Sequence, residues 1–170
     1  LNMGAGGYLN TNGMTSVLGS LKGMTVIVSI KPMVAAASEY VCNTDQTDLQ
    51  IFYASGKWQV KCSGGTGASN VTAFTTNTWQ LHSFVYNGNG ATNNDKLRYR
   101  YNKADQSLTI SGTVAATANA SNDNYVWGAS DASTTNPFKG YIGEVLLFNR
   151  ALTVGEVAGI ETYLGTKWGI

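Results

Sequence analysis

Charged residues are scarce in this sequence: they make up 12% of its 170 residues, about half the usual share of a soluble domain. The formal net charge of +1 provides no basic surface, so nucleic acid is not an expected partner. No apolar run approaches the length of a membrane span, and we expect no membrane insertion. The polar surface must come from Thr, Asn, Ser, Gln and the 20 glycines, which suits an extracellular or virion protein better than a cytosolic enzyme.

Groups that could perform catalysis are equally few. The one histidine, His82, lies in an expected strand without a companion motif, and we interpret it as a structural residue. Glycoside hydrolysis needs two carboxyl groups on either side of the scissile bond, usually held close together. The four glutamates are instead far apart in the chain: Glu39, Glu144, Glu156 and Glu161. We therefore predict that the protein is not an enzyme.

The chain has only two cysteines, Cys42 and Cys62. Residues 50–60 are typical of a hairpin around a glycine turn, and residues 38–43 of the strand before it. If the strands pair in sequential order, the cysteines lie two strands apart, roughly 9.5 Å, which exceeds the Cα separation of a disulfide. We therefore expect two free thiols, whereas a non-sequential strand order would reverse this prediction.

Short strands with turn signals between them recur along the chain, which predicts an all-β sandwich. Residues 1–23 are expected to be a loop-bearing entry with at most one short strand, and residues 63–68 a glycine-rich connection. Residues 87–95 are expected to be a polar loop, and residues 102–106 a turn. The remaining strands are expected over residues 25–30, 70–74, 78–86, 97–101, 108–114 and 125–128.

Two of these segments alternate clearly between apolar and polar residues. In residues 97–101, Leu97, Tyr99 and Tyr101 should face the core and both arginines the opposite side. In residues 78–86, one face should carry Trp79 and Leu81, and the other His82, Phe84 and Tyr86.

The last third of the chain combines a strand with a helix. Residues 141–148 form a compact apolar run that predicts a strand buried on both faces. Thr153 and Glu156 then have the spacing of a capping box, which marks the start of a helix. The apolar stripe of this helix, which should pack against the sandwich, consists of Val157, Ile160, Leu164 and Trp168.

Six segments in this order resemble concanavalin A-like domains of the laminin G-like type. They are residues 77–86, 97–102, 127–129, 138–145, 149–153 and 163–169. The resemblance covers residues 24–170 and implies a jelly-roll sandwich of two curved antiparallel sheets with one short C-terminal helix. Members are mainly non-catalytic modules of extracellular, bacterial surface and bacteriophage virion proteins that bind carbohydrate or protein. The chain departs from the family pattern at residues 102–106, where many members have a tighter Asn-Gly turn.

The resemblance also implies a candidate metal site. Laminin G-like folds often hold a calcium ion at the sandwich rim, and calcium prefers oxygen ligands from loops. The loop carboxylates here are Asp45, Asp48, Asp123 and Asp131. The simpler alternative is that these aspartates cap local backbone in turns.

Candidate ligand-binding residues are the aromatics not assigned to the core and the two arginines of residues 97–101. The aromatics, which could stack on sugar rings, are Tyr40, Tyr53, Trp58 and Tyr125. Arg98 and Arg100 could contact a partner or an acidic sugar. The alternatives are ordinary packing for the aromatics and a solvated face that discourages strand addition for the arginines.

Together these observations favour a non-catalytic binding or adhesion module on an extracellular or virion surface. The first hypothesis is a bacteriophage head or tail fibre or decoration protein that contacts host-surface or mucus glycans. Its partners would be a glycan or surface protein of a host cell and other virion or cell-surface subunits, oligomers included. The alternatives are a purely structural decoration domain that stabilises a capsid and an accessory carbohydrate-binding domain of a secreted bacterial enzyme. We expect residues 1–170 to form one domain, as part of a larger protein or assembled into one.

Overall fold

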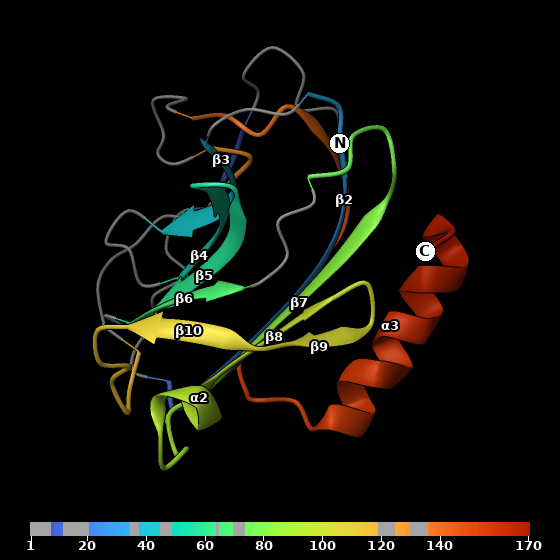
Figure 1. Cartoon of the computed structure of the whole chain (residues 1–170). Coiled ribbons are helices and arrows are strands. Elements are labelled where there is room, and N and C mark those ends of the chain that lie inside the picture. Colours follow the sequence, from blue (N-terminus) through green and yellow to red (C-terminus); the bar gives the residue numbers. More distant parts are fainter. Residues whose placement is uncertain are drawn as a thin grey trace.

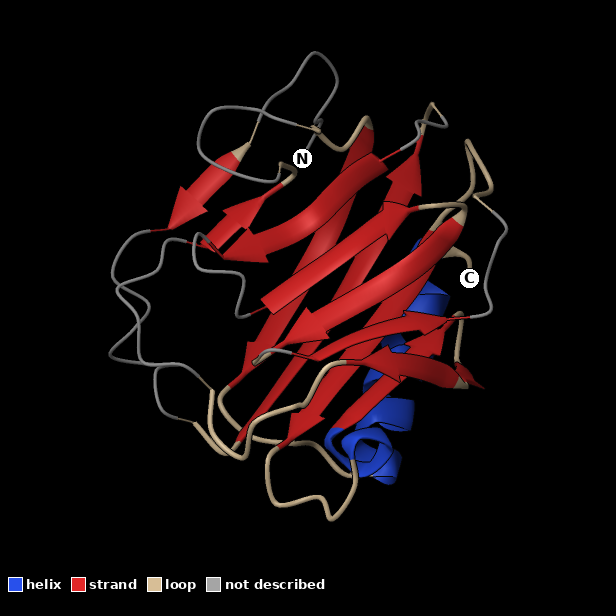
Figure 2. Cartoon of the chain, turned by 60° about the vertical axis from the view of Figure 1, so that its left-hand side comes forward, coloured by secondary structure: helices blue, strands red, loops and turns tan. Residues whose placement is uncertain are grey.

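The computed structural model describes residues 8–11, 21–34, 38–44, 49–63, 65–69, 74–118, 125–129 and 136–170. These residues form two antiparallel sheets, with the helix α3 (Val154–Trp168) on the outside (Figure 1). Figure 2 shows the sheets as stacked layers with this helix behind them. The predicted all-β jelly-roll sandwich with a short C-terminal helix is confirmed. None of the described helices is long and apolar enough to cross a membrane.

The first sheet has seven strands in the order β1-β11-β3-β4-β5-β6-β10. Adjacent strands in this order pair antiparallel along the whole sheet. The strands are β1 (Leu9–Thr11), β3 (Ser38–Thr44), β4 (Leu49–Ala54), β5 (Lys57–Cys62), β6 (Gly65–Ser69), β10 (Leu108–Ser111) and β11 (Tyr125–Trp127).

The second sheet has five strands in the order β12-β2-β7-β8-β9. Its central strands β2 and β7 are almost entirely buried because both faces of this sheet are covered. The strands are β2 (Gly23–Pro32), β7 (Gln80–Asn87), β8 (Leu97–Tyr101), β9 (Ala104–Gln106) and β12 (Gly140–Phe148).

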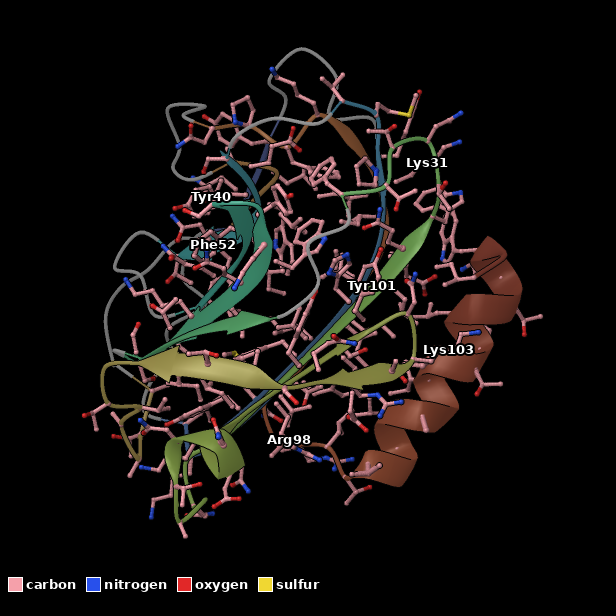
Figure 3. All side chains as sticks on the ribbon, in the orientation of Figure 1. Lys31, Tyr40, Phe52, Arg98, Tyr101 and Lys103 are labelled. Atoms are coloured by element: carbon pink, nitrogen blue, oxygen red, sulfur yellow. The ribbon has the colours of Figure 1, made fainter. Side chains whose placement is uncertain are left out.

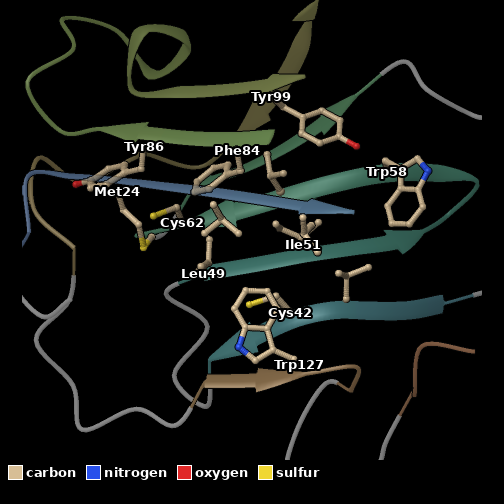
Figure 4. Close-up of a cluster of buried hydrophobic side chains, with 14 of the residues drawn as sticks. Met24, Cys42, Leu49, Ile51, Trp58, Cys62, Phe84, Tyr86, Tyr99 and Trp127 are labelled. Atoms are coloured by element: carbon tan, nitrogen blue, oxygen red, sulfur yellow. The ribbon is translucent and has the colours of Figure 1, made fainter. Parts of the chain in front are cut away.

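Two hydrophobic cores stabilise the fold, one on each face of the five-stranded sheet. The main core lies between the sheets and contains the buried rings of Trp58, Phe84 and Tyr99 (Figure 4). The smaller core lies between the five-stranded sheet and α3, where Leu81 of β7 belongs to the same cluster as Leu164 of the helix. The alternation predicted for residues 78–86 and 97–101 is thereby confirmed, since odd and even positions of β7 face different cores.

The predicted hairpin and free thiols are also confirmed. The strands β4 and β5 are joined by Ser55 and Gly56, whose φ angles of 52° and 74° suit a two-residue hairpin turn. Cys42 of β3 and Cys62 of β5 flank β4, and both are buried and form no disulfide. Sequential pairing of the three strands therefore keeps the cysteines too far apart for a disulfide.

The C-terminal strand and helix form as predicted, with one correction. Thr153 and Glu156 make both hydrogen bonds of a capping box at the start of α3. Gly143 lies at a β-bulge, where a Cβ atom would come within 2.8 Å of the Trp168 ring. The prediction that residues 141–148 are buried on both faces is wrong, because β12 is an edge strand and most of its residues are partly exposed.

Three segments expected to be loops or turns contain a strand or a short helix instead. Residues 63–68 are not merely a connection, because β6 pairs with both β5 and β10. Residues 102–106 form a two-residue turn at Asn102 and Lys103 followed by β9, which pairs with β8. The polar loop over residues 87–95 leads into a short helix, α2 (Asn93–Lys96), capped by Thr92. The expected strand over residues 70–74 lies outside the described residues except for Phe74.

Candidate functional site

The two sheets differ in what covers their outer faces. Helix α3 packs on the outer face of the five-stranded sheet and closes it with apolar contacts. Among the described residues, no helix packs on the outer face of the seven-stranded sheet (Figure 2). On this face Tyr40, Gln59 and Lys61 are partly exposed, whereas Phe52 is buried at 8% exposure.

An aromatic pair lies on this outer face. Tyr40 of β3 and Phe52 of β4 are directly opposite in the strand register, and their rings stack with centroids 5.0 Å apart and planes at 11°. Both rings lie on the side of the sheet away from the main core (Figure 3). Tyr40 is half-buried, and this burial raises the pKa of its phenol, which stays protonated and able to donate a hydrogen bond.

Polar side chains surround the aromatic pair. Gln50 donates from Nε2 to Asn43 Oδ1 at 2.6 Å, on the same face as the rings. Gln59 stands opposite Phe52 on β5, and Lys61 stands opposite Gln50. Gln50 and Asn43 are buried, whereas Gln59 and Lys61 are partly exposed. The accessible part of the face therefore combines the Tyr40 ring with one amide and one ammonium group, and such groups can contact the apolar face and the hydroxyls of a sugar.

Three predicted ligand-binding aromatics lie in the core instead. Tyr53, Trp58 and Tyr125 have exposed fractions of 9%, 0% and 6%. Trp58 contacts Phe74 in a stacked arrangement and His82 edge-on. These positions agree with the packing alternative, because strand residues that share a face with Ile51 and Val60 point between the sheets.

The two predicted arginines face α3 rather than open solvent. Arg100 forms hydrogen bonds from Nε to both carboxylate oxygens of Glu161 at 3.0 Å, and Glu161 is only 1% exposed. Arg98 donates to the backbone oxygen of Leu152 at 3.0 Å. Both arginines thus attach the C-terminal segment to the sheet, a role that the sequence pattern did not indicate.

The predicted calcium ligands Asp45, Asp48, Asp123 and Asp131 all lie outside the described residues. In the part of the chain that the structure describes, no group of three or more His, Cys, Asp or Glu side chains could hold a metal ion. Calcium binding at the rim stays a prediction.

The titratable groups that catalysis would use have structural partners. His82 is fully buried, its Nδ1 lies 2.7 Å from the Tyr99 hydroxyl, and burial lowers its pKa to about 3, so the ring is neutral. Glu144, Glu156 and Glu161 form salt bridges with separate cations: Lys167, Arg150 and Arg100. None of these carboxylates is paired with another in the way that glycoside hydrolysis requires.

The sequence analysis identified Tyr40 but missed Phe52, Gln50 and Asn43. The alternation of residues 50–54 carried the needed signal, because Gln50 and Phe52 must share one face of β4 while Ile51 and Tyr53 share the other. Local pattern alone could not show which of these faces the second sheet would cover.

Known structures with a similar fold include domains of carbohydrate-active proteins. The carbohydrate-binding domain CBM40 of the Ruminococcus gnavus IT-sialidase, bound to α2,3-sialyllactose, is 11% identical with a TM-score of 0.59, and the match covers 90% of this chain and 97% of that one. Domain 4 of AbnA, an extracellular arabinanase of Geobacillus stearothermophilus bound to arabinotriose, is 18% identical with a TM-score of 0.57, and 85% and 68% are covered.

A third similar structure is the NanB sialidase of Streptococcus pneumoniae, which is 17% identical with a TM-score of 0.63. The match covers 89% of this chain but only 26% of the sialidase chain. No curated protein sequence matches the chain. A family model described as "concanavalin A-like lectin/glucanases superfamily", of laminin G type, matches residues 3–158, and the chain therefore belongs to this superfamily.

Proposed function

We propose that this chain is a non-catalytic carbohydrate-binding module that holds a glycan on the outer face of its seven-stranded sheet. The observation that carries the proposal is the partly exposed Tyr40 ring, which stacks on the buried Phe52 on the sheet face away from α3. Tyr40 would stack on the apolar face of a sugar ring, and Gln59 and Lys61 would contact its hydroxyls. Two of the similar structures, which were solved with bound arabinotriose and sialyllactose, support this class of ligand.

A glycan array followed by calorimetric titration of the best ligand tests this proposal. We expect Tyr40→Ala to weaken binding at least about tenfold, because it removes the stacking ring, and Tyr40→Phe to keep most of the affinity. The matched control is Tyr163→Ala, which removes a 58% exposed tyrosine from α3 on the other side of the molecule. Equal affinity of Tyr40→Ala and the control, with unchanged melting of both, would contradict the sheet-face site.

The setting that we propose is the surface of a bacteriophage virion or of a bacterial cell, with the chain as one domain of a larger protein or assembly. The low charge and the Thr, Asn and Gly content of the sequence support an extracellular or virion surface. Electron microscopy of particles labelled with an antibody against this domain tests the phage setting, and unlabelled intact virions from the source phage would rule it out.

A second candidate function is an accessory domain of a secreted glycoside hydrolase. Two of the similar structures favour it, because they belong to an arabinanase and a sialidase. The open reading frame that contains residues 1–170 decides between the two settings: an adjoining hydrolase domain supports the accessory role, and virion structural genes on either side support the phage role.

A further inference from the structure

A cavity of about 450 Å³ lies at one end of the five-stranded sheet, where β2 begins and β7 and β12 end. Its lining includes Asn149, Arg150 and Ala151 of the segment that leads from β12 into α3. Its volume is within the usual range of small-molecule sites. No predicted ligand-binding residue lines it, and it belongs to a different sheet from Tyr40.

The backbone around this cavity is held in place by close contacts. A Cβ atom on Gly23 would lie 2.6 Å from the backbone nitrogen of Ala151, so the two segments meet directly. The Thr25 hydroxyl donates to the Arg150 backbone oxygen and accepts from the Leu152 N–H, both at 2.9 Å. The lining is therefore preformed, which lowers the entropy that a ligand must offset on binding.

The lining is rich in polar side chains that have spare hydrogen-bonding capacity. Three asparagines line the cavity, and within the described part of the chain Asn149 makes no side-chain hydrogen bond. The Asn87 Oδ1 accepts from the Asn89 N–H at 3.2 Å, which leaves the Asn87 amide NH₂ group available. Each amide offers a donor beside an acceptor, and this pattern matches the hydroxyl groups on adjacent carbons of a sugar.

Two cations also line the cavity, but they are not equivalent. Arg150 is engaged by Glu156 through two hydrogen bonds of 3.0 and 2.6 Å, which offset its charge. The Lys22 ammonium has no ion pair or hydrogen bond to a described residue. One uncompensated ammonium suits a monoanionic carboxylate. A phosphate dianion suits the cavity less, since Thr153 and Glu156 already cap the start of α3.

We propose that this cavity is a second binding site, specific for a carboxylate-bearing sugar. Lys22 pairs with the carboxylate, and the amides of Asn87, Asn89 and Asn149 bind the ring hydroxyls. The site acts independently of the Tyr40 face and adds a preference for acidic glycans, such as those that contain a uronic or a sialic acid.

Backbone amide NMR with ¹⁵N-labelled full chain tests this site, with D-glucuronate, D-galacturonate and N-acetylneuraminate as separate probes. D-glucose is the neutral counterpart of glucuronate. We expect at least one acidic sugar to shift the signals of Gly23, Asn89 and Ala151, and glucose to bind at least about tenfold more weakly. The affinity of each acid, measured from the shifts of these cavity signals, decides whether the site prefers a uronic or a sialic acid.

Lys22→Gln should weaken the binding of that acid at least about tenfold, and Asn149→Ala should weaken it as well. Lys31→Gln is the matched control, because it removes the same charge from the other end of β2 (Figure 3), about 30 Å away. This variant should bind the acid with wild-type affinity. Acid binding that survives Lys22→Gln, or no shift of the cavity signals by any acid, would overturn the proposal. Acid binding lost in Tyr40→Ala but kept in Lys22→Gln would assign the ligand to the sheet face and overturn this second site alone.

Discussion

Glu39 is an unusual residue because it places a carboxyl group in the interior of the sandwich. Its side chain is fully buried on β3, opposite Tyr53. One carboxyl oxygen accepts the Lys139 N–H at 3.4 Å, and the other has no hydrogen-bond partner among the described residues. The loss of hydration raises the pKa of Glu39 from 4.5 to about 7, so the neutral acid predominates below neutral pH.

Glu39→Gln should change how stability depends on pH. Between pH 4.5 and about 7 the folded chain keeps the Glu39 proton while the unfolded chain releases it. The folded state then binds more protons, so this group lowers the free energy of unfolding as pH rises, by up to about 3 kcal/mol. Relative to the wild type, the variant should gain stability over this interval. Urea unfolding at pH 4.5 and pH 8 measures it, and a constant difference between the two proteins would contradict the burial argument.

His82 acts in the opposite direction. Its pKa is about 3 in the folded chain and 6.5 in an unfolded one, so between these values the unfolded state binds more protons. The stability that the neutral ring contributes is therefore present above pH 6.5 and is lost as pH falls toward 3. In the wild type the two slopes oppose each other from pH 4.5 to 6.5, and Glu39→Gln should expose the slope of His82.

Helix α3 is attached to the sheet by apolar contacts and by one buried ion pair. Glu161 is a buried residue of α3, and Arg100 of β8 pairs with it. An ion pair in such a place adds little net stability, but removal of one partner leaves the other charge buried and unpaired. The pair therefore contributes more to where the helix docks than to how firmly it is held.

Arg100→Met should destabilise the fold by roughly 3–5 kcal/mol, because it strands the Glu161 carboxylate. The double variant Arg100→Met with Glu161→Met should recover most of this loss. Arg98→Met is the control: it loses only one hydrogen bond to a backbone oxygen, worth about 1–2 kcal/mol. Denaturant midpoints of the four proteins measure the effect. Equal losses for Arg98→Met and Arg100→Met would show that groups other than Arg100 stabilise the buried Glu161 carboxylate.

The strands and the helix were predictable to different degrees. The capping box of Thr153 and the alternation of residues 97–101 gave correct elements, because both patterns are set by neighbours within a few residues. The strands β6 and β9 were missed because their residues have little β-propensity, and their conformation depends on pairing with β5, β10 and β8.

Across the whole molecule, stability and the proposed glycan site lie on opposite sides. Helix α3 closes the five-stranded sheet, where Trp168 packs against Trp79 with ring centroids 4.3 Å apart and covers Gly143. The Tyr40 face belongs to the other sheet, across the main core. A change at the helix should therefore alter folding without altering the affinity of the folded protein.

Trp168→Ala tests this separation. We expect a loss of about 2–3 kcal/mol, below the value for a fully buried tryptophan because the ring is partly exposed. Thermal melting measures the loss, and calorimetry below the transition should give the wild-type glycan affinity. Unaltered melting would contradict the role of this ring in closing the fold, and a weakened affinity at full folding would show that the two sides communicate.

The amino-acid pattern was sufficient for the all-β class, the terminal helix and the absence of a disulfide, which follow from periodicity, capping and turn residues, and the resemblance of six segments indicated the superfamily. These signals are local, and each needs only a few adjacent side chains. Which strand residues face outward, by contrast, was decided by packing between segments that are distant in the sequence. Tyr40 and Tyr53 are equally good strand aromatics, yet one lies beside Phe52 on the outer face and the other in the core. Which face of a strand is open depends on which sheet or helix covers it, and that contact joins residues more than a hundred positions apart in the chain, as between Thr25 and Arg150.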